Sequence, residues 1–233
     1  MDGILYPYLE LTAVPEVGDA LLSPRAAYVV SADGARLLWA NAAGFALFGI
    51  GTLADLAALS LSDLNPLKAQ AARLARLLPS ATARAEMIRA GAGTQLNVFP
   101  AMCRRLNLPD DQRAVLMIAA AAGVTESLAA RAEKLVNAIG RRGHLALVAN
   151  EGMPLARSAD RDDHGDAGKD VDALLVAAAT PSRIAKGLLG DRPAGAVLFH
   201  AEGRACALLI IGPPEAARAT PTVPEKTATP VTP

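Results

Sequence analysis

The chain has 233 residues, enough for one large domain or two small ones with their own cores. Its 23 Lys and Arg residues equal its 23 Asp and Glu residues, which excludes the strongly basic surface of a protein that binds nucleic acid or an anionic membrane. Its apolar runs are too short to span a bilayer and its first residues lack the pattern of a secretory signal, so we expect a cytoplasmic protein.

The first strong pattern follows an N-terminal segment, residues 1–24. Two β-rich runs, Tyr28 to Val30 and Leu37 to Trp39, flank the turn residues Asp33 and Gly34, which predicts a hairpin. Asn41 then precedes a short helical stretch and is expected to cap it. On capping alone, Asn41→Ala should cost about 1 kcal/mol.

A longer helix is predicted to begin at Asn65, with Pro66 at its first position. Its apolar stripe is Leu67, Ala71, Leu74 and Leu78. Two long strands follow, over residues 94–108 and 113–122. In the first of them the even positions are expected to face the core, namely Leu96, Val98, Met102, Leu106 and Leu108.

Residues 125–140 predict a connecting helix that ends at Gly140. Its apolar positions are spaced by four, three and four residues: Leu128, Ala132, Leu135 and Ile139. Two alternatives remain open for this stripe. It either packs on the chain's own sheet or forms a parallel dimer seam that transmits signals.

Residues 143–212 repeat the order of hairpin, helices and hairpin in a shorter form. Helical stretches are expected near residues 170–179 and 182–189, between two strand pairs. Residues 213–233 hold six prolines and many threonines, which predicts a disordered linker or tail.

The stretch "VVSADGARLLWANAAGFALFG" resembles the start of a PAS domain. The matching residues are Asp33, Gly34, Asn41, Phe48 and Gly49. The later "CRRLNLPDDQRAVLMIAA" resembles the hairpin that closes such domains, so the resemblance covers residues 25–122. Residues 143–212 are similar to a degenerate second PAS-like unit. The alanine-rich sequence and its tail are similar to the N-terminal sensory region of alphaproteobacterial histidine kinases, including the PdhS group.

The resemblance implies an α+β fold: a PAS-like antiparallel sheet with helices on one face, the connecting helix, a smaller PAS-like unit and the tail. PAS domains that bind ligands hold haem, flavin or small acids between sheet and helices. The candidate pocket residues are Trp39, Phe45, Phe48 and Met102, with core packing as the alternative. The chain has few aromatic residues, so no tightly bound cofactor is expected.

No residue pattern indicates catalysis or a metal site. His144, His164 and His200 are expected to be surface or turn residues. The loop from Asp160 mimics a calcium loop, but Val171 stands where a bidentate carboxylate belongs, so a solvated loop is favoured. Cys103 and Cys206 form no Cys-x-x-Cys pair and are expected to be structural thiols.

The leading hypothesis is a non-catalytic sensory and dimerisation module that biases an output domain, which the resemblance implies to be a histidine kinase. Its expected partners are a second copy of the chain and signalling proteins or a downstream kinase domain, with no nucleic acid and no membrane. The alternatives are a PAS-like protein–protein scaffold without a ligand, or a stand-alone sensor that binds a small molecule. An enzyme is disfavoured because no nucleophile, base or phosphate loop clusters in the sequence.

Overall fold

The structure is a computed structural model, and it describes residues 5–62, 65–79, 82–92, 95–109, 112–121, 126–140, 144–151, 153–158, 173, 175–179 and 182–213. Two five-stranded antiparallel sheets and several helices confirm the α+β prediction, and their layout is consistent with two PAS-like units. The calcium-like loop from Asp160 lies outside the described residues, and so does the predicted tail, residues 213–233, except for its first residue, Pro213.

The first sheet has the strand order β2-β1-β5-β4-β3. Its strands are β1 (Ala27–Ser31), β2 (Leu37–Ala40), β3 (Arg84–Ala90), β4 (Asn97–Asn107) and β5 (Arg113–Ala119). The predicted hairpin is confirmed as β1 and β2. Gly34 adopts a φ of 72° in its turn, a conformation that favours glycine.

Helices α3 (Ala42–Phe48), α4 (Leu53–Ala58) and α5 (Pro66–Leu77) connect β2 to β3. The predicted caps are confirmed: the Asn41 side chain accepts a hydrogen bond from Gly44 N, and the Asn65 side chain accepts one from Leu67 N. The predicted stripe of α5 is buried. Arg73 of α5 pairs with Glu86 of β3, so this helix covers the face of the sheet from which Glu86 projects. We call this face inner and the opposite face outer.

The expected burial of the even positions is confirmed for Leu106, which is 4% exposed, but is wrong for Leu96, Val98 and Met102. Val98 is 56% exposed and Met102 is 39% exposed, whereas Ala101 and Cys103 are buried. The pattern identified a strand but not its core side, because alternation alone does not say which face is covered. Helix α5 covers the inner face, and Val98 and Met102 project from the outer face.

The second sheet repeats the topology of the first, in the order β7-β6-β10-β9-β8. Its strands are β6 (Leu145–Asn150), β7 (Met153–Arg157), β8 (Ile184–Leu189), β9 (Arg192–Ala201) and β10 (Arg204–Ile211). The helix expected near residues 182–189 is therefore wrong, because Ile184–Leu189 pairs with β9 as a strand. Residues 173 and 175–178 are helical, as expected for the other stretch.

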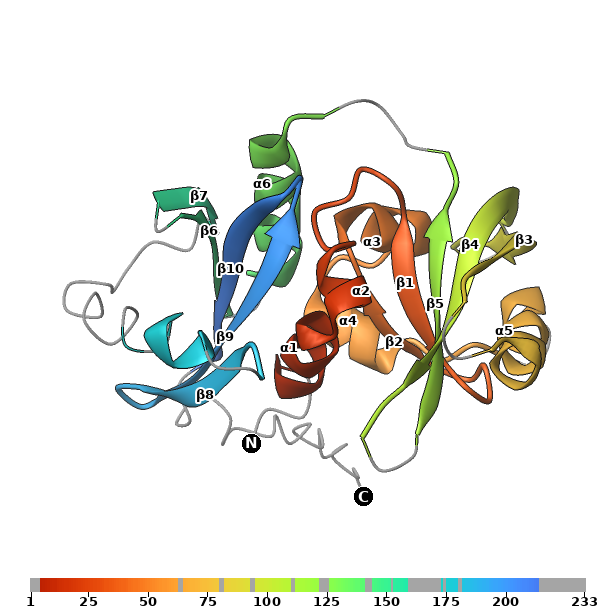
Figure 1. Cartoon of the computed structure of the whole chain (residues 1–233), viewed down its shortest axis with the longest axis horizontal. Helices are drawn as coiled ribbons and strands as arrows, with labels where there is room; N and C mark the ends of the chain where they lie inside the picture. Colours follow the sequence, from red (N-terminus) through yellow and green to blue (C-terminus); the bar gives the residue numbers. More distant parts are fainter. Residues whose placement is uncertain are drawn as a thin grey trace, which may run out of the picture.

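The N-terminal helices α1 (Leu5–Ala13) and α2 (Pro15–Gly18) lie between the two sheets (Figure 1). Helix α1 contacts β2 of the first sheet and β8 and β9 of the second. Buried residues of both sheets and of α1 join in one apolar core, and a smaller core lies on the other face of the second sheet. The two sheets are thus held together through the N-terminal helices.

Helix α6 (Leu128–Ile139) follows the first sheet and packs on β6, β7 and α3. Of its predicted stripe, Ala132, Leu135 and Ile139 are fully buried, and Leu128 is partly buried against the same core. The structure therefore shows the alternative in which the stripe packs on the chain's own sheet. A dimer seam along this stripe would require α6 to leave that sheet. No helix in the described part of the chain is long and apolar enough to cross a membrane.

Candidate functional site

Two of the four predicted pocket residues lie at the joint between α1 and the first sheet. Trp39 is fully buried and stacks on Tyr8 of α1, with ring centroids 5.9 Å apart. Its Nε1 donates a hydrogen bond to Thr12 Oγ1 at 2.9 Å. Phe45 contacts the same Tyr8 ring, with 6.4 Å between centroids. Their neighbours are thus side chains of the N-terminal helix.

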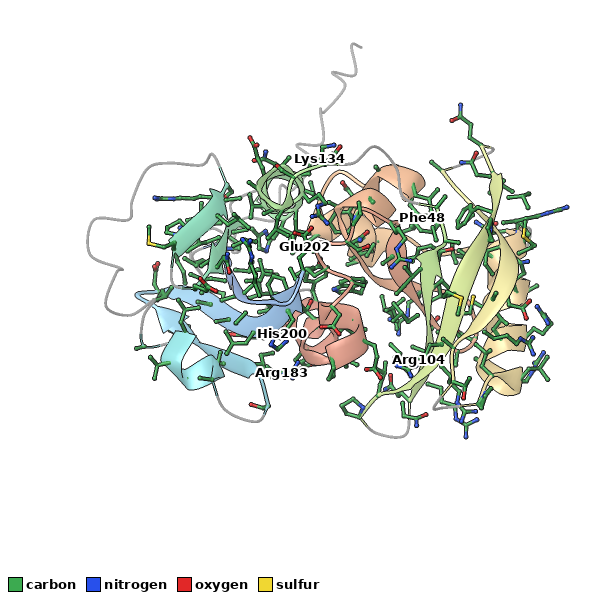
Figure 2. The ribbon with its side chains drawn as sticks, turned by 45° about the horizontal axis from the view of Figure 1, so that its top comes forward. Phe48, Arg104, Lys134, Arg183, His200 and Glu202 are labelled. Carbon is green, nitrogen blue, oxygen red and sulfur yellow. The ribbon has the colours of Figure 1, made fainter. Side chains whose placement is uncertain are left out.

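The other two predicted residues lie elsewhere. Phe48 packs edge-on against Tyr28, with ring centroids 5.0 Å apart (labelled in Figure 2). Met102 projects from the outer face of β4 and is partly exposed. Trp39 and Phe45 thus share a contact with Tyr8, whereas Phe48, three residues after Phe45 on α3, contacts Tyr28, and Met102 contributes to neither cluster.

A pocket of about 400 Å³ lies on the second sheet, beneath the short helix that includes residues 175–178. Its residues come from β6, β9, β10, this helix and the residue before β8: Ala149, Glu151, Leu175, Ala179, Arg183, Leu198, Phe199, His200, Ala205, Cys206 and Ala207. Four of them are alanines, whose short side chains leave space where larger residues would fill the core. The pocket is mainly apolar, with three ionisable side chains that do not belong to a core.

Those three side chains are Glu151, Arg183 and His200. Glu151 follows β6 and its amide donates to Ala205 O at 3.3 Å. Arg183 precedes β8, and its carbonyl accepts from Leu198 N at 2.8 Å. Within the described part of the chain, the side chains of Glu151, Arg183 and His200 make no hydrogen bond or ion pair.

A second pocket, of about 410 Å³, shares His200 with the first and is otherwise lined by Asp19, Glu202 and Gly203. In Figure 2, Glu202, His200 and Arg183 follow one another along the side of the second sheet that is nearer the first sheet in that view. His200 therefore stands at the junction of the two pockets.

The backbone around His200 is strained. Among the described residues, three that are not glycine have a positive φ: Glu151 at 50°, Arg183 at 56° and Glu202 at 51°. A positive φ is unfavourable for glutamate and arginine, and turns that need it usually contain Asn, Asp or Gly. All three are charged. Glu151 and Arg183 line the first pocket, and Glu202 lines the second. Strained residues tend to cluster at functional sites, so this coincidence marks the region around His200 as the candidate site.

One member of this cluster is tied to other parts of the chain. The carboxylate of Glu202 accepts a hydrogen bond from Nη2 of Arg131 on α6. The Arg131 side chain is only 8% exposed, and its Nη1 donates to the carbonyl of Leu22 in the N-terminal segment. Its Nε donates to Ser127 O at 3.4 Å. Arg131 thus links the turn beside His200 to α6 and to the segment that follows α2.

The histidines and cysteines do not form a catalytic arrangement in the described chain. His144 is buried, which corrects the expected surface position, and His164 lies outside the described residues. Cys103 and Cys206 are free and buried. Burial raises the pKa of the Cys103 thiol to about 12 and also raises the pKa of Cys206, so both are protonated near neutral pH. No group of three His, Cys, Asp or Glu suited to a metal occurs among the residues described.

A larger hollow of about 750 Å³ lies between α1, the start of β2, α4, the β4–β5 turn and β8. Its walls are mostly apolar, and an ion pair between Lys186 and Glu10 bridges β8 and α1 there. This hollow contains none of the strained residues.

No protein-family model and no curated protein matches the chain. Among solved structures, the chain is similar to an extracellular ligand-binding receptor from Desulfohalobium retbaense, with 9% identity, a TM-score of 0.25 and 80% of this chain covered. It spans only 30% of that receptor. The periplasmic domain of Vibrio cholerae LuxQ shows 12% identity and a TM-score of 0.23, over 81% of this chain and 70% of that one. The ligand-binding domain of Mlp24 with asparagine shows 10% identity and a TM-score of 0.24, over 86% and 72%. At these TM-scores the likenesses do not establish a shared fold or function.

Proposed function

We propose that the chain is a non-catalytic sensory module of a cytoplasmic signal-transduction protein, and that it binds a small molecule in the pocket beside His200. The observation that carries the proposal is the set of strained, charged residues at an otherwise apolar pocket. Ligand pockets in proteins commonly combine an apolar lining with a few polar groups that orient the ligand. Both thiols are protonated and buried, which supports binding rather than nucleophilic catalysis.

The proposed output runs through Arg131. A ligand beside His200 would change the surroundings of the β9–β10 turn, which Glu202 connects to Arg131 on α6. Because Arg131 also holds Leu22, a shift of this turn would alter how α6 and the N-terminal segment sit together. The resemblance to kinase sensory regions makes a histidine kinase domain the proposed recipient of that change.

The test measures thermal unfolding of the full chain with and without the small-molecule fraction of an extract from the expressing cells. We expect a higher Tm for the wild type. The variant Ala207→Phe, which fills the pocket floor, should show no such rise. Ala85→Phe is the matched control, since it adds the same ring to an exposed strand position of the first sheet. Equal shifts in all three proteins, or none in any, would contradict the proposal.

A second candidate function is a protein–protein scaffold that pairs with a second copy of the chain. The observation that favours it is an apolar strip on the outer face of β3 and β4, where Met87 and Val98 are each 56% exposed beside Met102. Helix α1 contacts the neighbouring strand β2, and Glu16 of α2 forms an ion pair with Arg104 of β4. Sedimentation of the wild type as a dimer, and of a Met87→Asp, Val98→Asp variant as a monomer, would support pairing through this strip. A wild-type monomer would oppose it.

A further inference from the structure

We infer that the ligand of the His200 pocket is a small zwitterion with an apolar body, such as an apolar α-amino acid. This inference rests on the proposed function and specifies its ligand. It follows from the placement of one negative and one positive side chain at opposite sides of the same apolar floor.

The two charges are separated across the sheet. Glu151 lies beside β10 at the end of β6, and Arg183 lies beside β9 at the start of β8. In the order β6-β10-β9-β8 their backbones are three strand spacings apart, about 14 Å. His200 lies between them, on β9. The long side chains of Glu151 and Arg183 both line the same pocket of about 400 Å³, as does His200, so a small molecule in it can contact both charges with the imidazole beside it.

Neither the Glu151 carboxylate nor the Arg183 guanidinium forms an ion pair within the described part of the chain. Glu202, the third strained residue, has an internal partner in Arg131, which accounts for its place in a turn. Glu151 and Arg183 make no such ion pair there, although both occupy equally unfavourable backbone conformations. Glu151 is exposed and Arg183 is half-buried, so both side chains are available to a bound ligand of complementary charge.

A ligand with a single charge fits less well. A carboxylate without an ammonium group would lie near Glu151 as well as Arg183, and an amine without a carboxylate would lie near Arg183 as well as Glu151. Like charges at these separations disfavour binding. The floor between them is apolar, with Ala149, Leu198 and Ala207 below and Leu175 above, and suits an aliphatic side chain.

The experiment is calorimetric titration of the full chain with three probes that share the 2-methylpropyl group. L-Valine carries both charges, 3-methylbutanoate lacks the ammonium group, and 2-methylpropylamine lacks the carboxylate. Glycine, L-leucine and L-phenylalanine extend the series in size. We expect an apolar amino acid to bind, and each single-charge analogue of valine to bind at least about tenfold more weakly.

Two variants assign the charges. Glu151→Gln should weaken valine binding about tenfold and leave 3-methylbutanoate binding unchanged or stronger. Arg183→Gln should weaken valine binding and leave 2-methylpropylamine binding unchanged or stronger. Glu133→Gln, at an exposed position on α6, is the control and should change none of these affinities. Thermal unfolding of each variant should match the wild type, which shows that the fold is retained.

The outcomes separate this inference from the proposed function. If the extract raises the Tm of the wild type but not of Ala207→Phe, and no amino acid of the series binds, the pocket is a ligand site and the zwitterion assignment is wrong. The same conclusion follows if 3-methylbutanoate binds as tightly as valine. If the extract also has no effect, both proposals fail.

Discussion

At the scale of single residues, Asn41 joins three parts of the chain. Its Oδ1 accepts hydrogen bonds from Gly44 N at 2.8 Å and from Ala27 N at 3.1 Å. Its Nδ2 donates to three carbonyls of the N-terminal segment, those of Ala20, Ser23 and Arg25. The side chain is fully buried. Asn41 is therefore a bridge from that segment to β1 and α3, in addition to the helix cap that its sequence context predicts.

Asn41→Ala should cost much more than a cap. It leaves several buried backbone groups without a partner, so we expect a loss of about 3 kcal/mol or more in the free energy of unfolding. Asn65→Ala is the matched control, because the Asn65 side chain caps α5 at a less buried position and should cost about 1 kcal/mol. Urea unfolding measures both. Equal losses for the two variants would show that the additional hydrogen bonds of Asn41 contribute little.

At the scale of secondary-structure elements, the sequence predicts features that depend on neighbouring residues better than features that depend on distant ones. The caps at Asn41 and Asn65 depend on residues two or three positions away, and the pattern was sufficient for both. Strand β8 was predicted as a helix, because its strand conformation depends on pairing with β9 rather than on its own composition. Helices α1 and α2 follow no strong pattern in the sequence, and they decide what the outer face of the first sheet meets.

The candidate site was missed for a related reason. His200, Glu151 and Arg183 come from segments that only the sheet brings together. One signal was present in the sequence: Glu-Gly pairs at 151–152 and 202–203, each between two strands, where Asn-Gly or Asp-Gly is usual. A glutamate in such a turn has an unfavourable backbone conformation. Because strained residues tend to occur at functional sites, this indicates a functional role for its carboxylate.

Arg131 supplies the polar contacts from α6 to Leu22 and to Glu202, beside the apolar packing of this helix. Arg131→Met keeps much of the side-chain volume but leaves the Leu22 carbonyl without this donor, so we expect a loss of about 1–3 kcal/mol in the free energy of unfolding. Hydrogen exchange in the β9–β10 turn should become faster, since Glu202 loses its partner. Lys134→Met is the control, because Lys134 is 61% exposed and its pair with Glu126 should contribute little. Unchanged exchange in the turn would remove Arg131 from the proposed signalling route.

Helix α5 is joined to β3 by a contact that depends on pH. Hydrogen bonds from Arg73 and then Arg84 hold the pKa of Glu86 below its usual value. A carboxylate with a lowered folded-state pKa stabilises the protein above its unfolded-state pKa, and this contribution is lost as the pH falls through the folded-state pKa.

Glu86→Gln should therefore reduce the free energy of unfolding by up to about 1 kcal/mol at neutral pH, and by less in acid. Urea unfolding at several pH values measures the difference between the two proteins. The exposed residue Glu133 supplies the control substitution, Glu133→Gln, which should give no such pH-dependent difference. A difference that stays constant with pH would show that Glu86 acts through packing alone.

At the scale of the whole molecule, one core includes residues of both sheets. Phe199 of β9 contributes to it, and Gly18 of α2 lies against that residue. A methyl group on Gly18 would stand 3.1 Å from Phe199 Cβ and 2.7 Å from the carbonyl oxygen of Thr12. The close approach of α2 to the second sheet therefore requires glycine at position 18.

Gly18→Ala should loosen both halves of the molecule together, at a cost of about 1–3 kcal/mol. Fluorescence of Trp39, the only tryptophan, reports on the first sheet, and hydrogen exchange of β10 reports on the second. Both probes should report the same loss in the free energy of unfolding if the chain unfolds as one unit. Leu188→Ala, at a side chain that is 69% exposed on β8, should change neither. A shift of one probe without the other would indicate two independently stable parts.

The position of α1 between the sheets also affects how the protein is made. Leu9 is synthesised well before the strand that it packs near, because β9 begins only at Arg192. At about 5–20 residues per second, on the order of 10–40 s separates their appearance. During this interval the apolar face of α1 cannot reach its final neighbours on the second sheet. A nascent chain therefore exposes the apolar face of α1 until the β9–β10 hairpin has been made, so its yield in cells should depend on chaperones that shield this helix.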